Sequence, residues 1–140
     1  MTQELLLDTH VFVWLLNGDK KLGRKARLAI NEAAKEGGVL VPAITPWEIA
    51  MLVAKERLAL DRDVGAWIDA AFRLPGIKLA PLLAEIAVAS TRLPWPCHAD
   101  PADRLIIATA RHFDAVLVTE DAQILKYAQK RHLQAISASS

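Results

Sequence analysis

Short apolar runs that alternate with helical segments constrain the fold of this chain more than any other feature. The runs predicted as strands cover residues 5–7, 39–41, 77–79, 115–119 and 135–136. Leu5–Leu7 has no polar side chain and Ala115–Thr119 has only one, as is typical of parallel strands buried on both faces. Strands that alternate with helices predict an α/β fold in three α/β/α layers, with a central parallel sheet of four to five strands.

The helices are predicted from apolar residues at helical spacing and from residues that commonly begin or end a helix. They cover residues 9–16, 22–36, 45–57, 82–91 and 101–110, with two more that run from Asp61 or Asp63 to Phe72 and from Asp121 through Tyr127. Thr45 and Glu48 have the spacing of a capping box, in which Thr45 begins the helix and Pro46 takes its first position. The Ser-rich end, Ser137–Ser140, is expected to fray.

Length and charge limit the classes of protein to consider. A chain of 140 residues fits one domain, residues 1–140, and is long enough to bury a sizeable core. Hydrophobic residues make up 53% of the sequence, which suggests a buried sheet or a partner surface. The formal net charge of +1 gives no bulk electrostatic attraction to nucleic acid, so any such contact has to be local.

The single cysteine and the absence of long apolar runs indicate the compartment. Cys97 has no second cysteine to pair with, so neither an intrachain disulfide nor a thiolate metal cluster is expected. No apolar run approaches the roughly 18 residues that a membrane helix needs, and the N-terminus lacks the pattern of a signal peptide. These features predict a soluble cytoplasmic protein that does not bind membranes.

Four carboxylates are predicted to meet at the carboxyl edge of the sheet. Asp8 and Asp121 each follow a predicted strand within a residue or two, whereas Glu48 and Asp103 lie in the first turns of predicted helices. If the strand Leu5–Leu7 neighbours the strand Ala115–Thr119, the four side chains converge. Ligands of α/β proteins commonly bind beyond this edge.

Bringing these acids together has an electrostatic cost that a cation can offset. Two like charges about 4 Å apart near a protein surface repel each other by roughly 4 kcal/mol. Mg²⁺ and Mn²⁺ prefer oxygen ligands and are commonly bound by a few carboxylates together with substrate phosphates. A cluster of this kind therefore points to metal-dependent hydrolysis of phosphodiester bonds.

Each acid also has a purely structural interpretation. Glu48 would complete the capping box with Thr45, Asp100 and Asp121 would cap helices, and Asp103 would be an acid favoured by the helix dipole. Asp8 has no such role unless it caps the helix that begins at Thr9. The metal-site hypothesis therefore depends on the four residues meeting and not on any one of them.

Several polar residues near these acids could support such a site. Thr9 and Thr119 could hydrogen-bond the carboxylates or cap their own helices. Arg104 could bind a phosphate with two hydrogen bonds or pair with a neighbouring acid. Asp100 could contact the metal, and His98 could orient Asp100 or contact a substrate.

The aromatic and basic residues have mainly structural interpretations. Trp14, Trp47 and Trp67 lie in helical segments and are expected in the core or at an interface. The densest basic stretch, residues 20–27, is expected to be a solvated helix face, although it could also steer RNA locally.

Four motifs in this order give the sequence its resemblance to a known family. They are Leu6-Leu7-Asp8-Thr9-His10, Thr45-Pro46-Trp47-Glu48-Ile49, the stretch from His98 to Ala108, and Leu117-Val118-Thr119-Glu120-Asp121. Together they cover nearly the whole chain, and they resemble the PIN-domain ribonucleases, specifically the VapC-type toxins of type II toxin-antitoxin pairs. Ala102 departs from the pattern, because this subgroup often has Phe at that position.

The resemblance implies a fold, an activity and partners. It implies a PIN-like α/β/α fold and an endoribonuclease that depends on Mg²⁺ or Mn²⁺, with RNA as substrate. Asp8, Glu48, Asp103 and Asp121 would be the catalytic carboxylates around the metal, and the family pattern selects Asp121 over the adjacent Glu120. The resemblance also implies a homodimer and a small antitoxin protein that covers the site.

Two other functions are compatible with the same residues. In a phosphoryl-transfer domain Asp8 would accept a phosphoryl group, but the sequence offers no obvious matching Lys and no second Asp two residues after Asp8. In a non-catalytic α/β binding module the acidic cluster would dock a basic segment of a partner, and the high apolar fraction would fit a partner surface.

Overall fold

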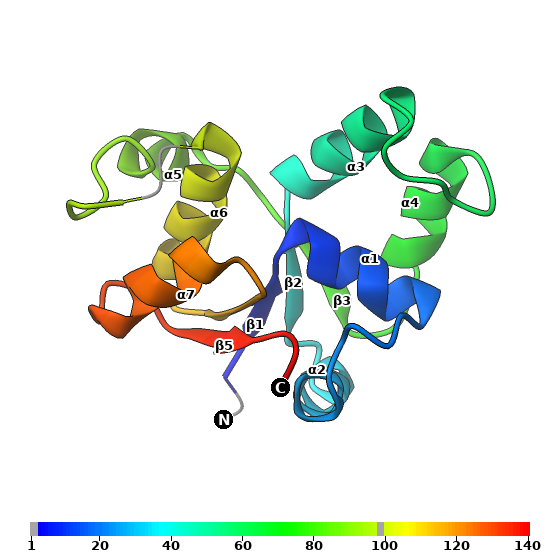
Figure 1. Cartoon of the computed structure of the whole chain (residues 1–140), viewed down its shortest axis with the longest axis horizontal. Coiled ribbons are helices and arrows are strands. Elements are labelled where there is room, and N and C mark those ends of the chain that lie inside the picture. Colours follow the sequence, from blue (N-terminus) through cyan, green and yellow to red (C-terminus); the bar gives the residue numbers. More distant parts are fainter. Residues whose placement is uncertain (1–2, 98–99) are drawn as a thin grey trace.

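The computed structural model describes residues 3–97 and 100–140 and is built around a parallel five-stranded sheet. The strand order is β3-β2-β1-β4-β5 (Figure 1). The strands are β1 (Leu5–Leu7), β2 (Val39–Pro42), β3 (Ile77–Ala80), β4 (Val116–Thr119) and β5 (Ala135–Ser137). Both the predicted α/β class and the predicted parallel sheet are confirmed.

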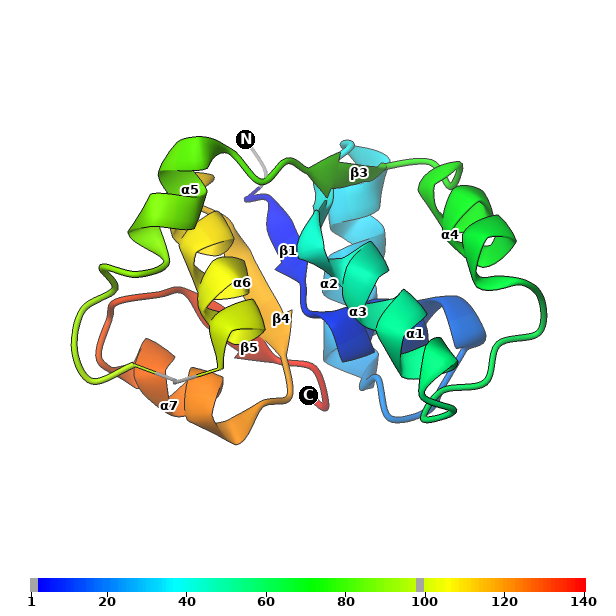
Figure 2. The same cartoon turned by 90° about the horizontal axis from the view of Figure 1, so that it is seen from above.

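The helices lie on the two faces of this sheet (Figure 2). They are α1 (Thr9–Asn17), α2 (Arg24–Lys35), α3 (Ile44–Ala54), α4 (Val64–Phe72), α5 (Ala84–Ala89), α6 (Pro101–His112) and α7 (Ala122–Gln129). None of them is both long and apolar enough to cross a membrane, within the ranges that the structure describes.

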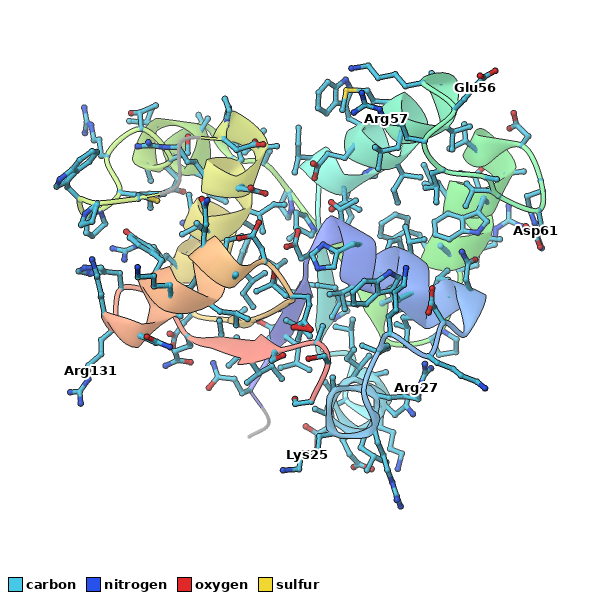
Figure 3. All side chains as sticks on the ribbon, viewed as in Figure 1. Lys25, Arg27, Glu56, Arg57, Asp61 and Arg131 are labelled. Carbon is cyan, nitrogen blue, oxygen red and sulfur yellow. The ribbon has the colours of Figure 1, made fainter. Side chains whose placement is uncertain are left out.

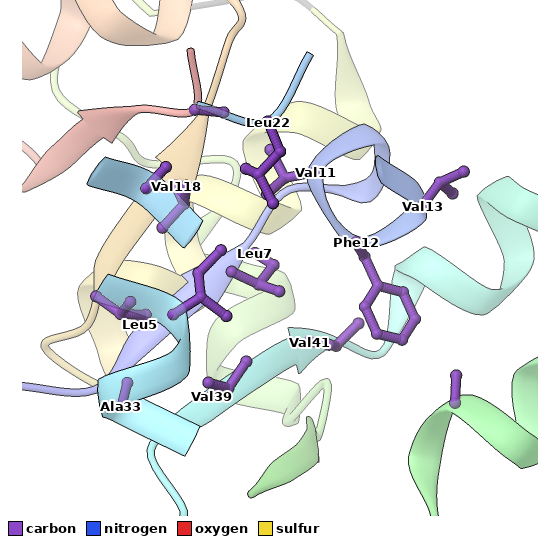
Figure 4. Packing of buried hydrophobic residues seen from close by; sticks show 14 of the residues in the cluster. Leu5, Leu7, Val11, Phe12, Val13, Leu22, Ala33, Val39, Val41 and Val118 are labelled. Carbon is purple, nitrogen blue, oxygen red and sulfur yellow. The ribbon is translucent and has the colours of Figure 1, made fainter. Parts of the chain in front are cut away.

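Two hydrophobic cores form because successive residues of a strand point to opposite faces of the sheet. Leu5 and Leu7 join the core under α1, α2 and α4, whereas Leu6 joins the core under α6 and α7. Figure 4 shows the first of these cores, in which Phe12 of α1 lies near Val41 of β2. The all-apolar run in β1 is therefore explained by burial on both sides.

The central position of β1 sets the place of Asp8. β1 pairs in parallel with β2 on one side and with β4 on the other, and Leu7 stands opposite Val118. The predicted adjacency of Leu5–Leu7 and Ala115–Thr119 is thus confirmed. Asp8 follows Leu7 directly, so it leaves the sheet at the carboxyl edge, next to the end of β4.

The predicted capping box at Thr45 is wrong. α3 begins at Ile44, and its N-cap Ala43 has no side chain that could accept a capping hydrogen bond; Pro46 is the third helical residue rather than the first. Thr45 is fully buried and its hydroxyl contacts Thr9 of α1 instead. The Thr45 side chain therefore makes a contact with α1 instead of capping its own helix as the local pattern had predicted.

The expectation of a frayed C-terminus is also wrong. Ala138 is fully buried and its carbonyl accepts a hydrogen bond from the Gly23 amide at 2.8 Å. The Ser140 carbonyl accepts another from the Ala26 amide at 3.1 Å. The Ser-rich end therefore provides hydrogen-bond acceptors for amides at the start of α2. These non-local contacts hold a segment whose composition alone suggested mobility.

The remaining differences are small shifts of helix ends. α2 begins at Arg24 rather than Leu22, and α5 is a short helix, Ala84–Ala89, within the longer predicted segment. Asp63, and not Asp61, caps α4 by accepting a hydrogen bond from the Ala66 amide. His98, which could orient Asp100 or contact a substrate, lies outside the described residues, as does Ala99.

Candidate active site

Asp8 is the most rigidly held acid of the candidate site. Its Oδ1 accepts a hydrogen bond from the Thr9 amide at 2.8 Å, which makes Asp8 the N-cap of α1. Its Oδ2 accepts another from the Thr119 hydroxyl at 2.6 Å, and the residue is only 4% exposed. A buried carboxylate with hydrogen bonds at both oxygens has a fixed direction, and a carboxylate oxygen keeps lone pairs for a further ligand.

Thr9 connects Asp8 to Glu48 of α3. The Thr9 hydroxyl donates to Glu48 Oε1 at 2.6 Å, and it lies 2.9 Å from the Thr45 hydroxyl. Because a hydroxyl has one proton to donate, the bond to Glu48 makes Thr45 the donor to Thr9. This chain of hydrogen bonds turns Glu48 toward the start of α1.

Glu48 is in an environment that disfavours its charged form. Partial burial raises the pKa of its carboxyl above the ordinary value, and the negative charges of Asp8 and Asp100 raise it further. The hydrogen bond from Thr9 opposes this effect by lowering the pKa. Mutual repulsion among Glu48, Asp8 and Asp100 therefore indicates a site that favours a cation.

The acids of the second half of the chain lie at the starts of two helices. Asp100 caps α6 by accepting hydrogen bonds from the Ala102 and Asp103 amides, so its predicted cap role is confirmed. Asp103 lies in the first turn of the same helix. Both the cap at Asp100 and the following Pro101 explain why α6 begins here.

Asp121 caps α7 and is joined to Asp8 through Thr119. Its Oδ1 accepts hydrogen bonds from the Gln123 and Ile124 amides, at 2.9 and 3.0 Å. The Asp121 amide donates to Thr119 Oγ1 at 3.1 Å, while the same hydroxyl donates to Asp8. One buried threonine thus orients the ends of β1 and β4 toward each other.

Glu120 points elsewhere, although it is adjacent to Asp121. Its carboxylate accepts a hydrogen bond from the Ser137 hydroxyl at 2.7 Å. Hydrogen bonds from Ser139 and Ser137 hold the pKa of the Glu120 carboxyl below its ordinary value. Glu120 therefore contacts the C-terminal segment.

Asp8, Glu48, Asp103 and Asp121 all line one pocket of about 270 Å³, together with Thr9 and His10. The acids come from the ends of β1 and β4 and from the starts of α3 and α6, as predicted. Among the described residues no three acidic, histidine or cysteine side chains are close enough to hold an ion directly. The four carboxylates supply only oxygen donors, which fits Mg²⁺ or Mn²⁺, and waters that Mg²⁺ keeps when it binds to carboxylates would complete its shell.

His10 is a pocket residue to which sequence reasoning assigned no role. Its Nε2 accepts a hydrogen bond from the Glu120 amide at 3.1 Å, so the ring proton lies on Nδ1, which is 3.7 Å from Asp8 Oδ2. The imidazole edge also contacts the Trp14 ring, with 5.0 Å between centroids. Two signals were available: its place in the first helical turn, two residues after Asp8, and its place at the end of the first family motif.

Arg104 lies in α6 and contacts the neighbouring helix α5. Its Nε donates to the Ser90 carbonyl at 3.0 Å, which ties α6 to the end of α5. Thr9 and Thr119, in contrast, contact the predicted carboxylates directly. The two threonines thus orient the carboxylates, whereas the printed contact of Arg104 ties α6 to α5.

Comparison with known proteins places this arrangement in a family. The model of the PIN domain matches residues 5–130. The chain belongs to the PIN-domain family. This PIN domain is 35% identical over 128 residues to Ribonuclease VapC22 of Mycobacterium tuberculosis, a match that covers 91% of this chain and 94% of that protein. The resemblance to VapC-type proteins is therefore confirmed.

Two solved structures share the fold of this PIN domain. VapBC2 from Rickettsia felis, bound to a DNA fragment from its promoter, matches with a TM-score of 0.70 at 17% identity, covering 95% of this chain and 97% of that chain. FitAB bound to an IR36 DNA fragment matches with a TM-score of 0.66 at 19% identity, covering 97% of this chain and 96% of that chain.

Proposed function

We propose that this PIN domain is a metal-dependent endoribonuclease and the toxin of a toxin-antitoxin pair. The observation that carries the proposal is the pocket into which Asp8, Glu48, Asp103 and Asp121 all project. The homology to Ribonuclease VapC22 over most of both chains supports RNA as the substrate. Such an enzyme would act in the cytoplasm.

The protein's own residues have distinct parts in the proposed reaction. Asp8, Glu48, Asp103 and Asp121 would hold one or two Mg²⁺ or Mn²⁺ ions, with Asp8 kept in place by the Thr9 amide and the Thr119 hydroxyl. A divalent cation at this position supplies a water activated for attack and neutralises charge on the phosphate. Thr9 keeps the Glu48 carboxylate turned toward the same place.

The exposed apolar residues support the proposed partners, a homodimer mate and a small antitoxin. Leu79, Leu82, Leu83 and Val88 are all exposed and follow one another through the segment from β3 to α5. Large exposed apolar side chains that gather in one segment are typical of interaction surfaces. We assign this segment to a protein interface, and the acidic pocket to the substrate.

The test is cleavage of a mixed RNA pool by the purified chain, with Mg²⁺, with Mn²⁺ or with chelator. Cleavage that requires a metal would support the proposal. Tight binding of a basic partner segment without hydrolysis of any RNA would instead support the non-catalytic binding module. Covalent labelling of Asp8 by a small phosphodonor would support the phosphoryl-transfer domain.

Replacing Glu48 with Gln is expected to raise the thermal stability of the metal-free protein. Gln keeps an oxygen for the Thr9 hydroxyl but removes a partly buried charge that Asp8 and Asp100 repel. We expect Tm to rise by about 2–4 °C at pH 7 in chelator, measured by circular dichroism. Mg²⁺ should raise the Tm of the wild type more than that of the variant.

The pH dependence of this effect has a defined sign. Because folding raises the pKa of Glu48, the folded protein binds more protons than the unfolded chain, and its stability falls as pH rises through that interval. The advantage of Glu48→Gln should therefore disappear below the ordinary value of 4.5. Glu32→Gln, which removes only an exposed ion pair with Lys35 on α2, is the control and should change Tm little. An equal Tm for wild type and Glu48→Gln at pH 7 would contradict the prediction.

A further inference from the structure

The pocket that holds the carboxylates has a second part of different chemistry. Besides the acids, it is lined by Val13 and Trp14 of α1, by Leu52 of α3, and by Arg57 and Leu58 just beyond α3. Hydrolysis of a phosphodiester needs none of these apolar and aromatic side chains. They form a surface next to the acids that fits a planar, partly apolar group with a negative charge attached.

The apolar and aromatic part of the pocket extends away from the acids along α1 and α3. The two helices contact each other, and both begin at the carboxyl edge of the sheet (Figures 1 and 2). His10 and Trp14 are four residues apart in α1, as are Glu48 and Leu52 in α3, so each pair lies on one face of its helix. With a rise of about 1.5 Å per residue, Trp14 lies about 9 Å from Asp8 along the axis of α1.

Trp14 is held in place on two sides. The His10 ring meets it in a T-shaped contact, with an interplanar angle of 63°. The Lys21 ammonium lies 5.9 Å from the centroid of the indole. Trp14 is only half-buried, so a restrained aromatic side chain is left partly accessible in the pocket. Successive bases of single-stranded nucleic acid stack on side chains of this kind.

Arg57 is fixed by the way α3 ends. The Glu56 amide donates to the Val53 carbonyl and the Arg57 amide donates to the Leu52 carbonyl, which is the pattern of a Schellman motif. Glu56 has φ of 58°, a left-handed conformation that residues other than glycine seldom adopt. This turn places Arg57 beside Leu52 at the pocket; Figure 3 shows Glu56 and Arg57 together at the end of α3.

We propose that Trp14 and Arg57 form a subsite for the nucleotide next to the scissile phosphate of a single-stranded RNA. The Trp14 indole stacks on the base, and the Arg57 guanidinium binds the adjoining phosphate. A pocket of about 270 Å³ admits one nucleotide but no duplex, and RNA is read mostly through unpaired, splayed bases. This inference rests on the proposed ribonuclease function and names the residues that position its substrate.

Binding can be tested without catalysis by following tryptophan fluorescence. The purified chain is titrated with hexaribonucleotides of A, C, G or U in chelator, which withholds the metal that the proposed cleavage requires. We expect quenching by at least one single-stranded hexamer, and loss of that quenching in Trp14→Phe, which keeps a ring for packing. Trp47→Phe and Trp95→Phe, at exposed positions outside this pocket, should retain it.

Cleavage kinetics test the same subsite in the metal-loaded protein. Trp14→Leu is expected to raise KM for RNA by about 10-fold or more with little change in kcat, because a stacked base contributes to binding. Arg57→Gln should raise KM and weaken its dependence on salt, whereas Arg62→Gln should not. Arg62 is a matched control because it is exposed and paired with Asp61, which Figure 3 shows at the outer edge of the molecule.

The outcomes separate this inference from the proposed function. Metal-dependent cleavage with an unchanged KM in both Trp14→Leu and Arg57→Gln would overturn the subsite and leave the ribonuclease intact. Quenching of Trp14 by hexalysine peptide but by no hexaribonucleotide would assign the surface to a basic partner segment and also overturn it. Quenching by RNA without any cleavage would support the subsite while the ribonuclease proposal failed.

Discussion

Asp8→Asn is expected to reduce metal-dependent RNA cleavage by at least about 100-fold. Removing a residue that only hydrogen-bonds a metal ligand costs up to about 100-fold in activity, and removing a ligand itself should cost at least as much. Asp8 is held in position by the start of α1, through the Thr9 amide, and by the end of β4, through the Thr119 hydroxyl. Asn has a similar shape but lacks the negative charge that a cation requires. The measurement is the initial rate of cleavage in Mg²⁺ and in Mn²⁺.

Stability has to be measured beside activity in this experiment. Asn can still accept the hydrogen bond from the Thr9 amide, so the cap of α1 is kept and the melting curve should remain cooperative. Asp69→Asn, at an exposed position of α4, is the matched control and should cleave as the wild type does. Full metal-dependent activity in Asp8→Asn would remove Asp8 from the proposed site.

Gly76→Ala is expected to have the largest effect on stability. Gly76 precedes β3 with φ of 82°, and a Cβ added there would lie 2.0 Å from the Ala34 carbonyl oxygen of α2. The strained conformation and the overlap with main chain together cost about 2–5 kcal/mol. We expect Tm to fall by about 8 °C or more, measured by circular dichroism or calorimetry.

Gly18→Ala separates the two causes of this loss. Gly18 also has a positive φ, of 64°, but a Cβ there would meet nothing within 4 Å. Its substitution should therefore cost only the conformational penalty, about 1–2 kcal/mol. If both variants lost the same stability, the close approach of α2 to the start of β3 would have no energetic importance.

The parts of the fold that depend on local signals could be predicted from the sequence. The apolar run Leu5–Leu7 predicted a strand buried on both faces, and Asp100 followed by Pro101 predicted the start of α6. The parallel sheet then brings the ends of its strands to one edge, which is why Asp8 and Asp121 could be expected together. These inferences need only the direction of strands and the chemistry of helix starts.

What the sequence could not predict depends on contacts between distant residues. The Thr45 hydroxyl has equal chemical ability to cap its own helix or to bind Thr9, and the choice is made by the packing of α3 against α1. Ser140 is held by the Ala26 amide, a contact that composition cannot reveal. Trp14 was expected in the core or at an interface. Its place in the pocket could not be predicted, because the pocket also depends on where α3 ends.

The hydrogen bond between Asp8 and Thr119 joins residues 111 positions apart in the chain. Contacts of such long sequence separation form slowly, because closing a long loop costs more conformational entropy than forming a local contact. During synthesis the N-terminal strand leaves the ribosome long before β4 exists, and β1 has no neighbour on that side until then. A growing chain therefore cannot assemble the four-carboxylate pocket, and the proposed nuclease stays inactive until the segment through Asp121 has been translated and β4 has paired with β1.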